Sequence, residues 1–240
     1  MHWVEVAIGS PRHRGLLIPL EEMHLYILDE GKDKPVYRSM YFYDEEGKTY
    51  VDKNGTLKNY FGMRYIDEIL VDIDKGQNTD AFTLKLAQGI LFELEELGVP
   101  GGAIQPYFSG TGYHIALSGE LFNFPASKDL PFIVKNTMTT LLDGLDASVY
   151  QRTGIYRLPH TLNEKRGLYK IPLELNELTN LSADAILELA KTQRLDYDYP
   201  DLWADGELEE QVITEVPQIR ALKTVVEPKN IVPCVQQMYR

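Results

Sequence analysis

The run Ile69-Leu70-Val71-Asp72-Ile73-Asp74-Lys75-Gly76 decides the fold expected of this chain. Apolar and acidic residues alternate along it, and this period of two is typical of a β-strand. Asp72 and Asp74 then lie on one face of the strand, about 7 Å apart. Two such carboxylates repel each other, and Mg²⁺ or Mn²⁺ would compensate the repulsion because hard cations prefer carboxylate oxygens. Two solvated carboxylates on an exposed strand are the alternative.

The composition sets the class of protein. With 240 residues, 44% hydrophobic and 25% charged, the chain is expected to form one domain, or one domain with an appendage. No run approaches the roughly 20 apolar residues of a membrane helix, and Glu5, Arg12 and Arg14 interrupt any early signal sequence. Cys234 is the single cysteine, which excludes an internal disulfide and a multi-cysteine zinc site. We therefore expect a soluble, cytoplasmic protein with no membrane partner.

The formal net charge of −12 argues against nucleic-acid binding over the whole surface, because phosphate contacts need local positive charge. A local basic groove remains compatible with an acidic body. Five basic residues within one short stretch predict such a groove, with an ordinary solvated face as the alternative: Arg152, Arg157, Lys165, Arg166 and Lys170.

The remaining helices and strands are predicted from the spacing of apolar residues and from capping and turn residues. Apolar residues recur with a helical period over residues 81–97, with Thr79 or Asp80 as the N-cap and Gly98 as the stop. Asn54-Gly55 is typical of a hairpin turn, and Asp146 is predicted to open a strand. Further strands are predicted over 23–28, 35–43, 103–109, 155–158 and 168–172, and further helices over 130–142, from Ser182 onward and over 206–223.

A second informative run is Ser109-Gly110-Thr111-Gly112-Tyr113-His114, which lies between two strand-like segments. It predicts a hairpin whose glycines accept a positive φ and a close backbone approach. Backbone amides in such a turn can cradle an anion, Ser109 adds a hydroxyl, and His114 is a candidate phosphate donor near neutral pH. A plain hairpin, in which His114 bonds a neighbouring carbonyl, is the alternative.

Together with Asp146, these two runs resemble the catalytic core of the archaeo-eukaryotic primase (AEP) superfamily, with the primase-polymerases as the nearest group. The family's hydrophobic-Asp-hydrophobic-Asp strand matches residues 71–74, and its Ser-Gly turn ending in histidine matches residues 109–114. Its third motif, an Asp that starts a strand, matches Asp146, and the similarity continues to Leu158. The resemblance covers about residues 35–175.

The resemblance implies an α+β (α/β) fold: an AEP primase-like core with an RNA-recognition-motif-like mixed sheet backed by helices. Periodicity alone indicates only α/β or α+β, and leaves an antiparallel or a mixed sheet open. The catalytic domain is expected over residues 1–180. Residues 181–240 are expected to form a small C-terminal helical extension or the start of a linker.

The same resemblance implies a template-dependent nucleotidyltransferase, a DNA primase or primase-polymerase that works by a two-metal-ion mechanism. Asp72, Asp74 and Asp146 would be the catalytic residues and would hold two Mg²⁺ or Mn²⁺ ions. The candidates for binding the incoming nucleotide are Ser109, Gly110, His114, Arg157, Lys165 and Arg38. The implied partners are a single-stranded DNA template, nucleoside triphosphates, and a helicase or other replication proteins, in a prokaryotic, plasmid or viral setting.

Some residues depart from the family. The single cysteine leaves no zinc module, Thr111 stands where many relatives carry a basic residue, and no G-x-x-x-x-G-K-S/T motif occurs. Nucleotide addition is therefore better supported than the start of new strands. Two other functions stay open: a non-catalytic nucleic-acid or nucleotide-binding module of a replication complex, and a metal-dependent phosphodiesterase or nuclease.

Overall fold

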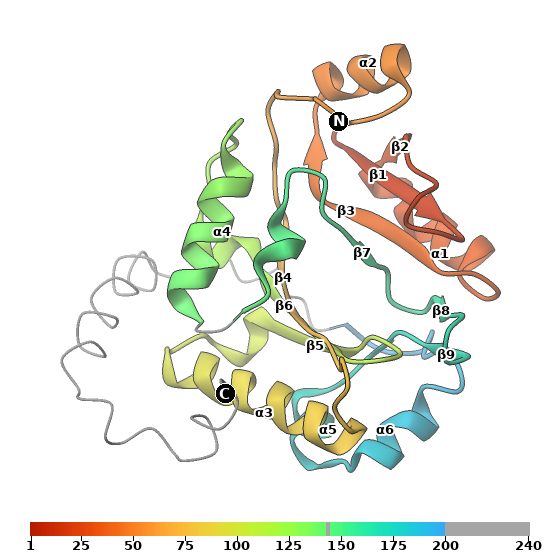
Figure 1. Cartoon of the computed structure of the whole chain (residues 1–240), viewed down its shortest axis with the longest axis vertical. Coiled ribbons are helices and arrows are strands. Elements are labelled where there is room, and N and C mark those ends of the chain that lie inside the picture. Colours follow the sequence, from red (N-terminus) through yellow and green to blue (C-terminus); the bar gives the residue numbers. More distant parts are fainter. Residues whose placement is uncertain (143–144, 200–240) are drawn as a thin grey trace.

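The computed structural model describes residues 1–142 and 145–199, which form an α+β architecture with two four-stranded sheets (Figure 1). The first sheet has the order β2-β1-β3-β7, and the second has the order β10-β5-β6-β4. The strands are β1 (Trp3–Ile8), β2 (Leu16–Pro19), β3 (Val36–Tyr43), β4 (Glu68–Ile73), β5 (Ile104–Phe108), β6 (Tyr113–Ser118), β7 (Ile155–Arg157), β8 (Leu162–Asn163), β9 (Leu168–Tyr169) and β10 (Ile171–Pro172). The described helices are α1 (Met23–Glu30), α2 (Glu45–Asn54), α3 (Asp80–Glu96), α4 (Leu130–Leu141), α5 (Leu175–Asn180) and α6 (Ala183–Leu189).

The second sheet is built around the hairpin of β5 and β6. Strand β4 pairs with β6 on the side away from β5, so β4 and β5 run in the same direction with β6 between them. All strand pairs among the described residues are antiparallel, so the predicted mixed sheet is wrong. The reason is the short turn after β5, because it returns the chain directly into the space between the two co-directional strands.

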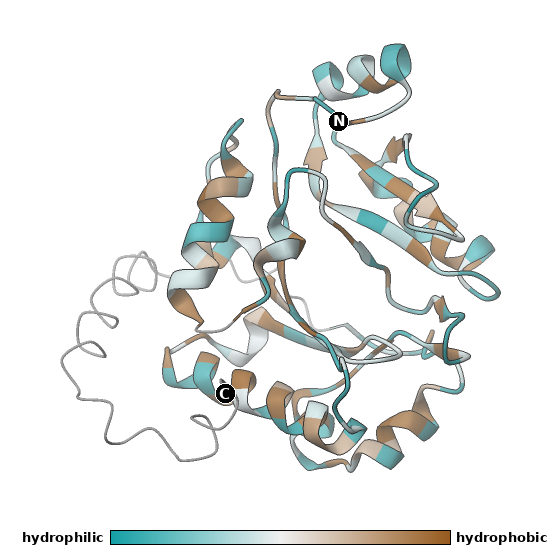
Figure 2. Cartoon of the chain, viewed as in Figure 1, coloured by the Kyte–Doolittle hydropathy of each residue, from teal (hydrophilic) through white to brown (hydrophobic). Residues whose placement is uncertain are grey.

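Helix α3 joins β4 to β5 and confirms the helix predicted there. The Thr79 hydroxyl accepts a hydrogen bond from the Phe82 amide at its start, and Gly98 follows its end with a φ of +80°. Hydrophobic and hydrophilic bands alternate along α3 and α4 (Figure 2). The buried stripe of α3 comprises Leu84, Ala87, Leu91 and Leu94, which belong to the main core with the strands of the second sheet.

The strands predicted over 35–43, 103–109 and 155–158 and the helix predicted over 130–142 are confirmed within a few residues at their ends. The strand predicted over 23–28 is wrong, because this segment is α1 and packs Met23 and Ile27 against a small apolar cluster at helical spacing. Asn54-Gly55 forms no hairpin. Gly55 instead caps α2 with a φ of +69°, and the Asp44 carboxylate caps its start. The predicted strand at Asp146 is a single 3₁₀ turn.

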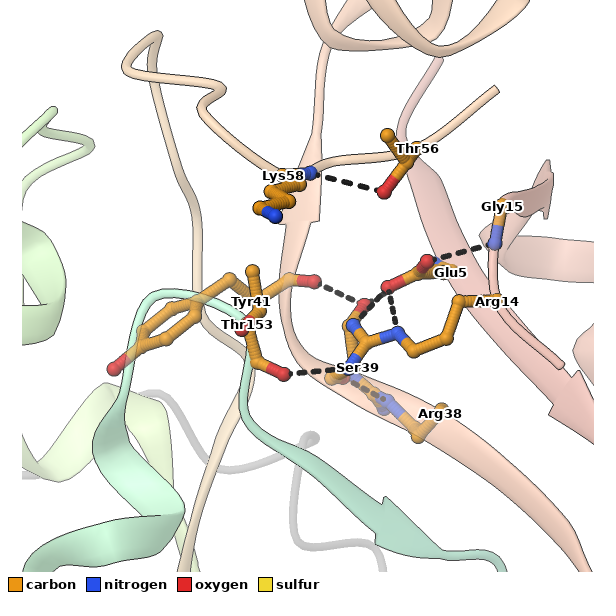
Figure 3. A network of polar contacts seen from close by, with 9 residues as sticks. All are labelled: Glu5, Arg14, Gly15, Arg38, Ser39, Tyr41, Thr56, Lys58 and Thr153. Carbon is orange, nitrogen blue, oxygen red and sulfur yellow. Dashed lines mark hydrogen bonds and ion pairs between the residues drawn. The ribbon is translucent and has the colours of Figure 1, made fainter. Parts of the chain in front are cut away.

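A polar network ties the first sheet to the loop before β7 (Figure 3). The buried Glu5 carboxylate accepts hydrogen bonds from the Arg14 guanidinium and, at 2.9 Å, from the Gly15 amide. Arg14 Nη1 also donates to the Thr153 carbonyl at 2.8 Å. The Ser39 hydroxyl accepts from the Glu5 amide at 3.1 Å, where the register between β1 and β3 shifts. The loop around residue 153 is therefore held against β1 and β2.

Helix α6 starts after Ser182, whose hydroxyl accepts a hydrogen bond from the Ala185 amide, as predicted. Ile186 and Ala190 are fully buried in the main core. The helix predicted over 206–223 lies outside the described residues, so the predicted division at residue 180 stays a prediction. Within residues 1–142 and 145–199, none of the helices has both the length and the apolar character needed to cross a bilayer.

Candidate functional site

Four polar side chains lie in a row at the second sheet. Asp72 on β4 is paired in register with His114 on β6, which is paired in turn with Tyr107 on β5. His114 Nε2 lies 3.5 Å from Asp72 Oδ1, and Lys170 Nζ lies 4.5 Å from the centre of the Tyr107 ring. The sheet therefore places a carboxylate, an imidazole, a phenol and an ammonium group side by side.

Asp72 is the least exposed of the three predicted acids, Asp72, Asp74 and Asp146. Burial, together with the negative charges of Asp74 and Asp146, raises the pKa of Asp72 to about 6, although Lys170 and Arg157 oppose the increase. Asp74 and Asp146 are exposed, whereas the Asp72 side chain is only 29% exposed. The structure thus brings two of the predicted acids, Asp74 and Asp146, within electrostatic range of the third, Asp72.

Asp146 reaches this position without belonging to a strand. It caps the 3₁₀ turn over Ala147–Tyr150, and its Oδ1 accepts from the Ser148 amide at 2.8 Å. The Tyr150 hydroxyl at the end of this turn donates to the Leu70 carbonyl on β4 at 2.9 Å. The Tyr41 hydroxyl donates to the Tyr150 carbonyl at 3.0 Å. These two buried hydrogen bonds fix the turn beside the acidic strand.

The predicted hairpin turn closes onto the end of β4. The Ser109 amide donates to the Gly112 carbonyl at 2.9 Å, and the Gly112 amide donates to the Ser109 hydroxyl at 3.0 Å. Gly110 has a φ of +90°, which favours glycine. A Cβ atom at Gly112 would lie 2.2 Å from the carbonyl oxygen of Ile73. The absence of side chains at these glycines therefore lets the turn contact the backbone between Asp72 and Asp74.

Two cations lie behind the turn. Arg157 Nη1 donates to the Ser109 carbonyl at 2.8 Å, and Lys170 Nζ donates to the Arg157 carbonyl at 2.7 Å. Burial lowers the pKa of Lys170 to about 7, although Glu68 and Asp72 favour its charged form. Burial also holds the pKa of His114 well below its usual value, with Lys170 and Arg157 adding to the effect. His114 is consequently a neutral imidazole near pH 7.

Two polar atoms of this site are buried without a hydrogen-bond partner among the described residues: His114 Nδ1 and Arg157 Nε. A buried polar atom left unpaired costs about 1–3 kcal/mol. Such atoms are rare in folded proteins and are typical of positions that a water molecule or a ligand completes. Both lie on the side of the site where the sequence predicts the triphosphate.

Arg38 and Lys165 occupy different surroundings. Arg38 is 3% exposed and makes two hydrogen bonds to the Asp67 carboxylate, at 2.7 and 2.9 Å. Its guanidinium lies 5.5 Å from the centre of the Tyr156 ring, inside the protein. Lys165 is exposed and follows Asn163, whose side chain lies 2.7 Å from the position of a Cβ atom at Gly110. Lys165 is therefore close to the hairpin turn, whereas Arg38 is engaged by the partly buried carboxylate of Asp67.

Sequence reasoning placed Lys170 in a basic cluster but did not name it, or Tyr107, as a site residue. The signal for Lys170 was its position between Tyr169 and Ile171 in an otherwise apolar strand-like run, where a lysine is expected only with partners. Tyr107 gave no signal, because an aromatic residue in a strand is usually part of the core.

The three acids do not lie in a preformed metal site. Among the described residues, no three His, Cys, Asp or Glu side chains are close enough together to hold an ion as they lie. Their chemistry nevertheless fits a hard divalent cation, since all three are carboxylates, and burial together with repulsion by Asp74 and Asp146 disfavours the charge of Asp72 unless a cation neutralises it. Asp74 and Asp146 are exposed, so their side chains have solvent space in which to turn toward Asp72.

Comparison of the sequence with protein-family models and with curated proteins finds no match.

Proposed function

We propose that this chain is a template-dependent nucleotidyltransferase, the catalytic core of a DNA primase or primase-polymerase of the AEP type. The observation that carries the proposal is the division of charge across one site, which combines β4 of the second sheet, the 3₁₀ turn after Asp146 and the end of β7 of the first sheet. Asp72, Asp74 and Asp146 form its acidic side, and Arg157 and Lys170 form its cationic side. The order of β4, α3, β5 and β6, with β6 between two co-directional strands, is compatible with an RNA-recognition-like core.

Phosphoryl transfer needs mainly positioning and charge neutralisation, and the acidic side suits the cations that supply both. Two divalent ions, when bound, would activate a 3′-hydroxyl and neutralise the triphosphate. Asp72, Asp74 and Asp146 would hold them. Hydrogen bonds fix the 3₁₀ turn to β4, so the turn that follows Asp146 is held beside the strand that carries Asp72.

The opposite side suits the triphosphate. Backbone amides and the Ser109 hydroxyl lie at the turn, and Arg157, Lys170 and Lys165 supply positive charge around it. A neutral His114 has one ring N–H, which would donate to a phosphate oxygen. Such a hydrogen bond favours the charge that develops on the leaving pyrophosphate. Arg38 would contribute only its positive charge and no direct hydrogen bond to the triphosphate, because its Nη1 and Nη2 donate to Asp67.

The proposal extends to the partners expected from the sequence. A single-stranded DNA template and nucleoside triphosphates are the substrates, and a helicase or other replication proteins would work with the enzyme. The setting would be the cytoplasm, in prokaryotic, plasmid or viral replication.

The test is incorporation of labelled nucleotides on single-stranded DNA, with and without an annealed primer, in Mg²⁺ and in Mn²⁺. Wild-type protein should extend the primer, and Asp72→Asn and Asp146→Asn should reduce the rate at least about 100-fold, because each removes a carboxylate from the proposed ion site. Asp29→Asn, at an exposed aspartate of α1, is the matched control and should retain the wild-type rate.

Product formed without a primer would show that initiation lies within this chain. Full activity of Asp72→Asn would contradict the metal assignment. The absence of product from folded wild-type protein under every condition would instead support the non-catalytic binding module.

A further inference from the structure

A separate cleft of about 910 Å³ lies beside α2. Helix α2 forms one wall, and the segment after it forms another. The residues that line it are Glu45, Glu46, Thr49, Tyr50, Lys53, Asn54, Asn59, Tyr60, Phe61, Gly62 and Lys128. None of the candidate nucleotidyltransferase residues belongs to this lining, so the cleft needs its own explanation.

The cleft contains an unusual aromatic group. Phe61 is 61% exposed, and the Arg152 guanidinium lies 5.2 Å from the centre of its ring. The Tyr50 and Tyr60 rings, also in the lining, have centres 5.2 Å apart. Covering an exposed aromatic ring with a flat apolar surface is favourable, because it removes apolar area from water. Nucleobases are flat, and they stack on aromatic rings and on arginine.

The charges around the cleft favour a base over a phosphate within it. Glu45 and Glu46 lie in the first turn of α2 and would repel a phosphate at that end of the cleft, whereas Lys53 lies in the last turn of the same helix. Lys128 and Arg152 lie on the other side, where a sugar-phosphate backbone could follow them. Asn54 and Asn59 add amide groups that can bond base edges. An unpaired base inside, with its phosphates toward Lys128 and Arg152, satisfies this distribution.

Arg152 is held in place before any ligand binds. Its Nη1 donates to the Lys128 carbonyl at 3.2 Å, and its Nη2 lies 3.8 Å from Asp129 Oδ1. The next residue, Thr153, accepts a hydrogen bond from Arg14 through the network of Figure 3. A fixed guanidinium loses less entropy when a base stacks beside it, which strengthens binding.

We propose that this cleft binds an unpaired base of a single-stranded nucleic acid, stacked on Phe61 next to Arg152. In Figure 1 the chain passes from α2 at the top of the view through β4 toward α3, so one continuous segment joins the cleft to the acidic strand. Arg152 likewise follows Asp146 by one short turn. The identification of the bound strand as the template rests on the proposed function, whereas the stacking contact does not.

The test is fluorescence anisotropy with a 5′-labelled oligothymidylate of about 20 nucleotides, without nucleoside triphosphates. Phe61→Ala should weaken binding at least about fivefold, since stacking of one base contributes about 1–3 kcal/mol. Phe61→Trp should bind at least as tightly as wild type, because it keeps the ring. Phe132→Ala removes another exposed phenylalanine, 64% exposed on α4 and outside the cleft, and should bind like wild type.

Wild-type affinity in Phe61→Ala, or equal losses in Phe61→Ala and Phe61→Trp, would overturn the inference. Unlabelled duplex DNA should compete poorly, and competition equal to that of the single strand would also overturn it. Primer extension by the same proteins separates the two proposals. If wild-type protein adds no nucleotides but binds the oligothymidylate, and Phe61→Ala binds it more weakly, the base-binding cleft would be supported and the polymerase activity refuted.

Discussion

Replacing Lys170 with methionine is expected to stabilise the fold while damaging the site. Lys170 is 1% exposed, its Nζ donates to the Arg157 carbonyl, and aromatic rings of Tyr107 and Tyr156 lie 4.5 and 5.3 Å away. Burial outweighs these partners and lowers the pKa of Lys170 from 10.5 to about 7. Methionine has a similar shape and removes the charge, so it isolates the cost of burying the ammonium group.

The magnitude follows from linkage between protonation and folding. Because the folded state binds this proton less tightly than the unfolded state, the charge of Lys170 destabilises the fold fully below pH 7 and not at all well above pH 10.5. At about 1.4 kcal/mol for each pH unit between these values, the cost reaches about 5 kcal/mol at pH 6 and falls to about 2 kcal/mol at pH 9. Leaving the Arg157 carbonyl unpaired offsets about 1–3 kcal/mol.

Lys170→Met should therefore raise the free energy of unfolding by about 2–4 kcal/mol at pH 6 and change it little at pH 9. Urea unfolding followed by circular dichroism at both pH values measures this. Lys85→Met, at an exposed lysine on α3, is the control and should stay within about 0.5 kcal/mol of wild type. Destabilisation at pH 6, or an equal change at both pH values, would refute the reasoning. Primer extension by Lys170→Met should be slower, because the proposed triphosphate site loses a cation.

Three further predictions concern stability and are measured by urea unfolding. Asp72→Asn should raise the free energy of unfolding by up to about 3 kcal/mol at pH 8 without metal, because the Asp72 carboxylate has a pKa of about 6. Near pH 3, below the usual pKa of an aspartate, this gain should vanish. The absence of a gain at pH 8 would contradict the unfavourable charge of Asp72 described above. Arg38→Ala should cost about 3–5 kcal/mol by leaving a partly buried carboxylate unpaired, and a loss under about 1 kcal/mol would show that the ion pair is dispensable. Gly110→Ala should cost more than about 1 kcal/mol, since it combines a φ of +90° with a contact 2.7 Å from Asn163 Cβ. Gly167→Ala, with a φ of +64° and open space around it, is the matched control and should cost less.

The predictions for Asp72 and Lys170 separate stability from function. The charged forms of Asp72 and Lys170 both cost folding free energy, mainly because the two groups are buried. Repulsion by Asp74 and Asp146 adds to the cost at Asp72, and repulsion by Arg157 and Arg38 adds to it at Lys170. Ionisable groups with shifted pKa values concentrate at functional sites, because the surrounding structure holds them in an environment that disfavours their charge. A variant that is more stable and less active at both positions would support the site as a unit.

The sequence by itself determined the local elements of the second sheet. Alternation from Ile69 to Asp74 predicted β4, a capping threonine and a terminal glycine bounded α3, and the glycines after Ser109 predicted the hairpin. These features depend on the period of apolar residues and on backbone preferences within a few positions, which the sequence displays directly. The same local signals failed over α1 and α2, where aromatic and Asn-Gly patterns are shared by strands, hairpins and helix ends.

The tertiary structure decided which distant residues meet. Strand register placed His114 between Asp72 and Tyr107, and hydrogen bonds from Tyr150 and Tyr41 brought Asp146 beside β4 without a strand. The basic residues that the sequence grouped were divided between three places: the hairpin site, the Phe61 cleft, and the start of α3, where Arg166 pairs with Asp80. Register and burial depend on packing between segments far apart in the chain. For this reason the types of side chain are visible in the sequence, and their partners and pKa values follow only from the fold.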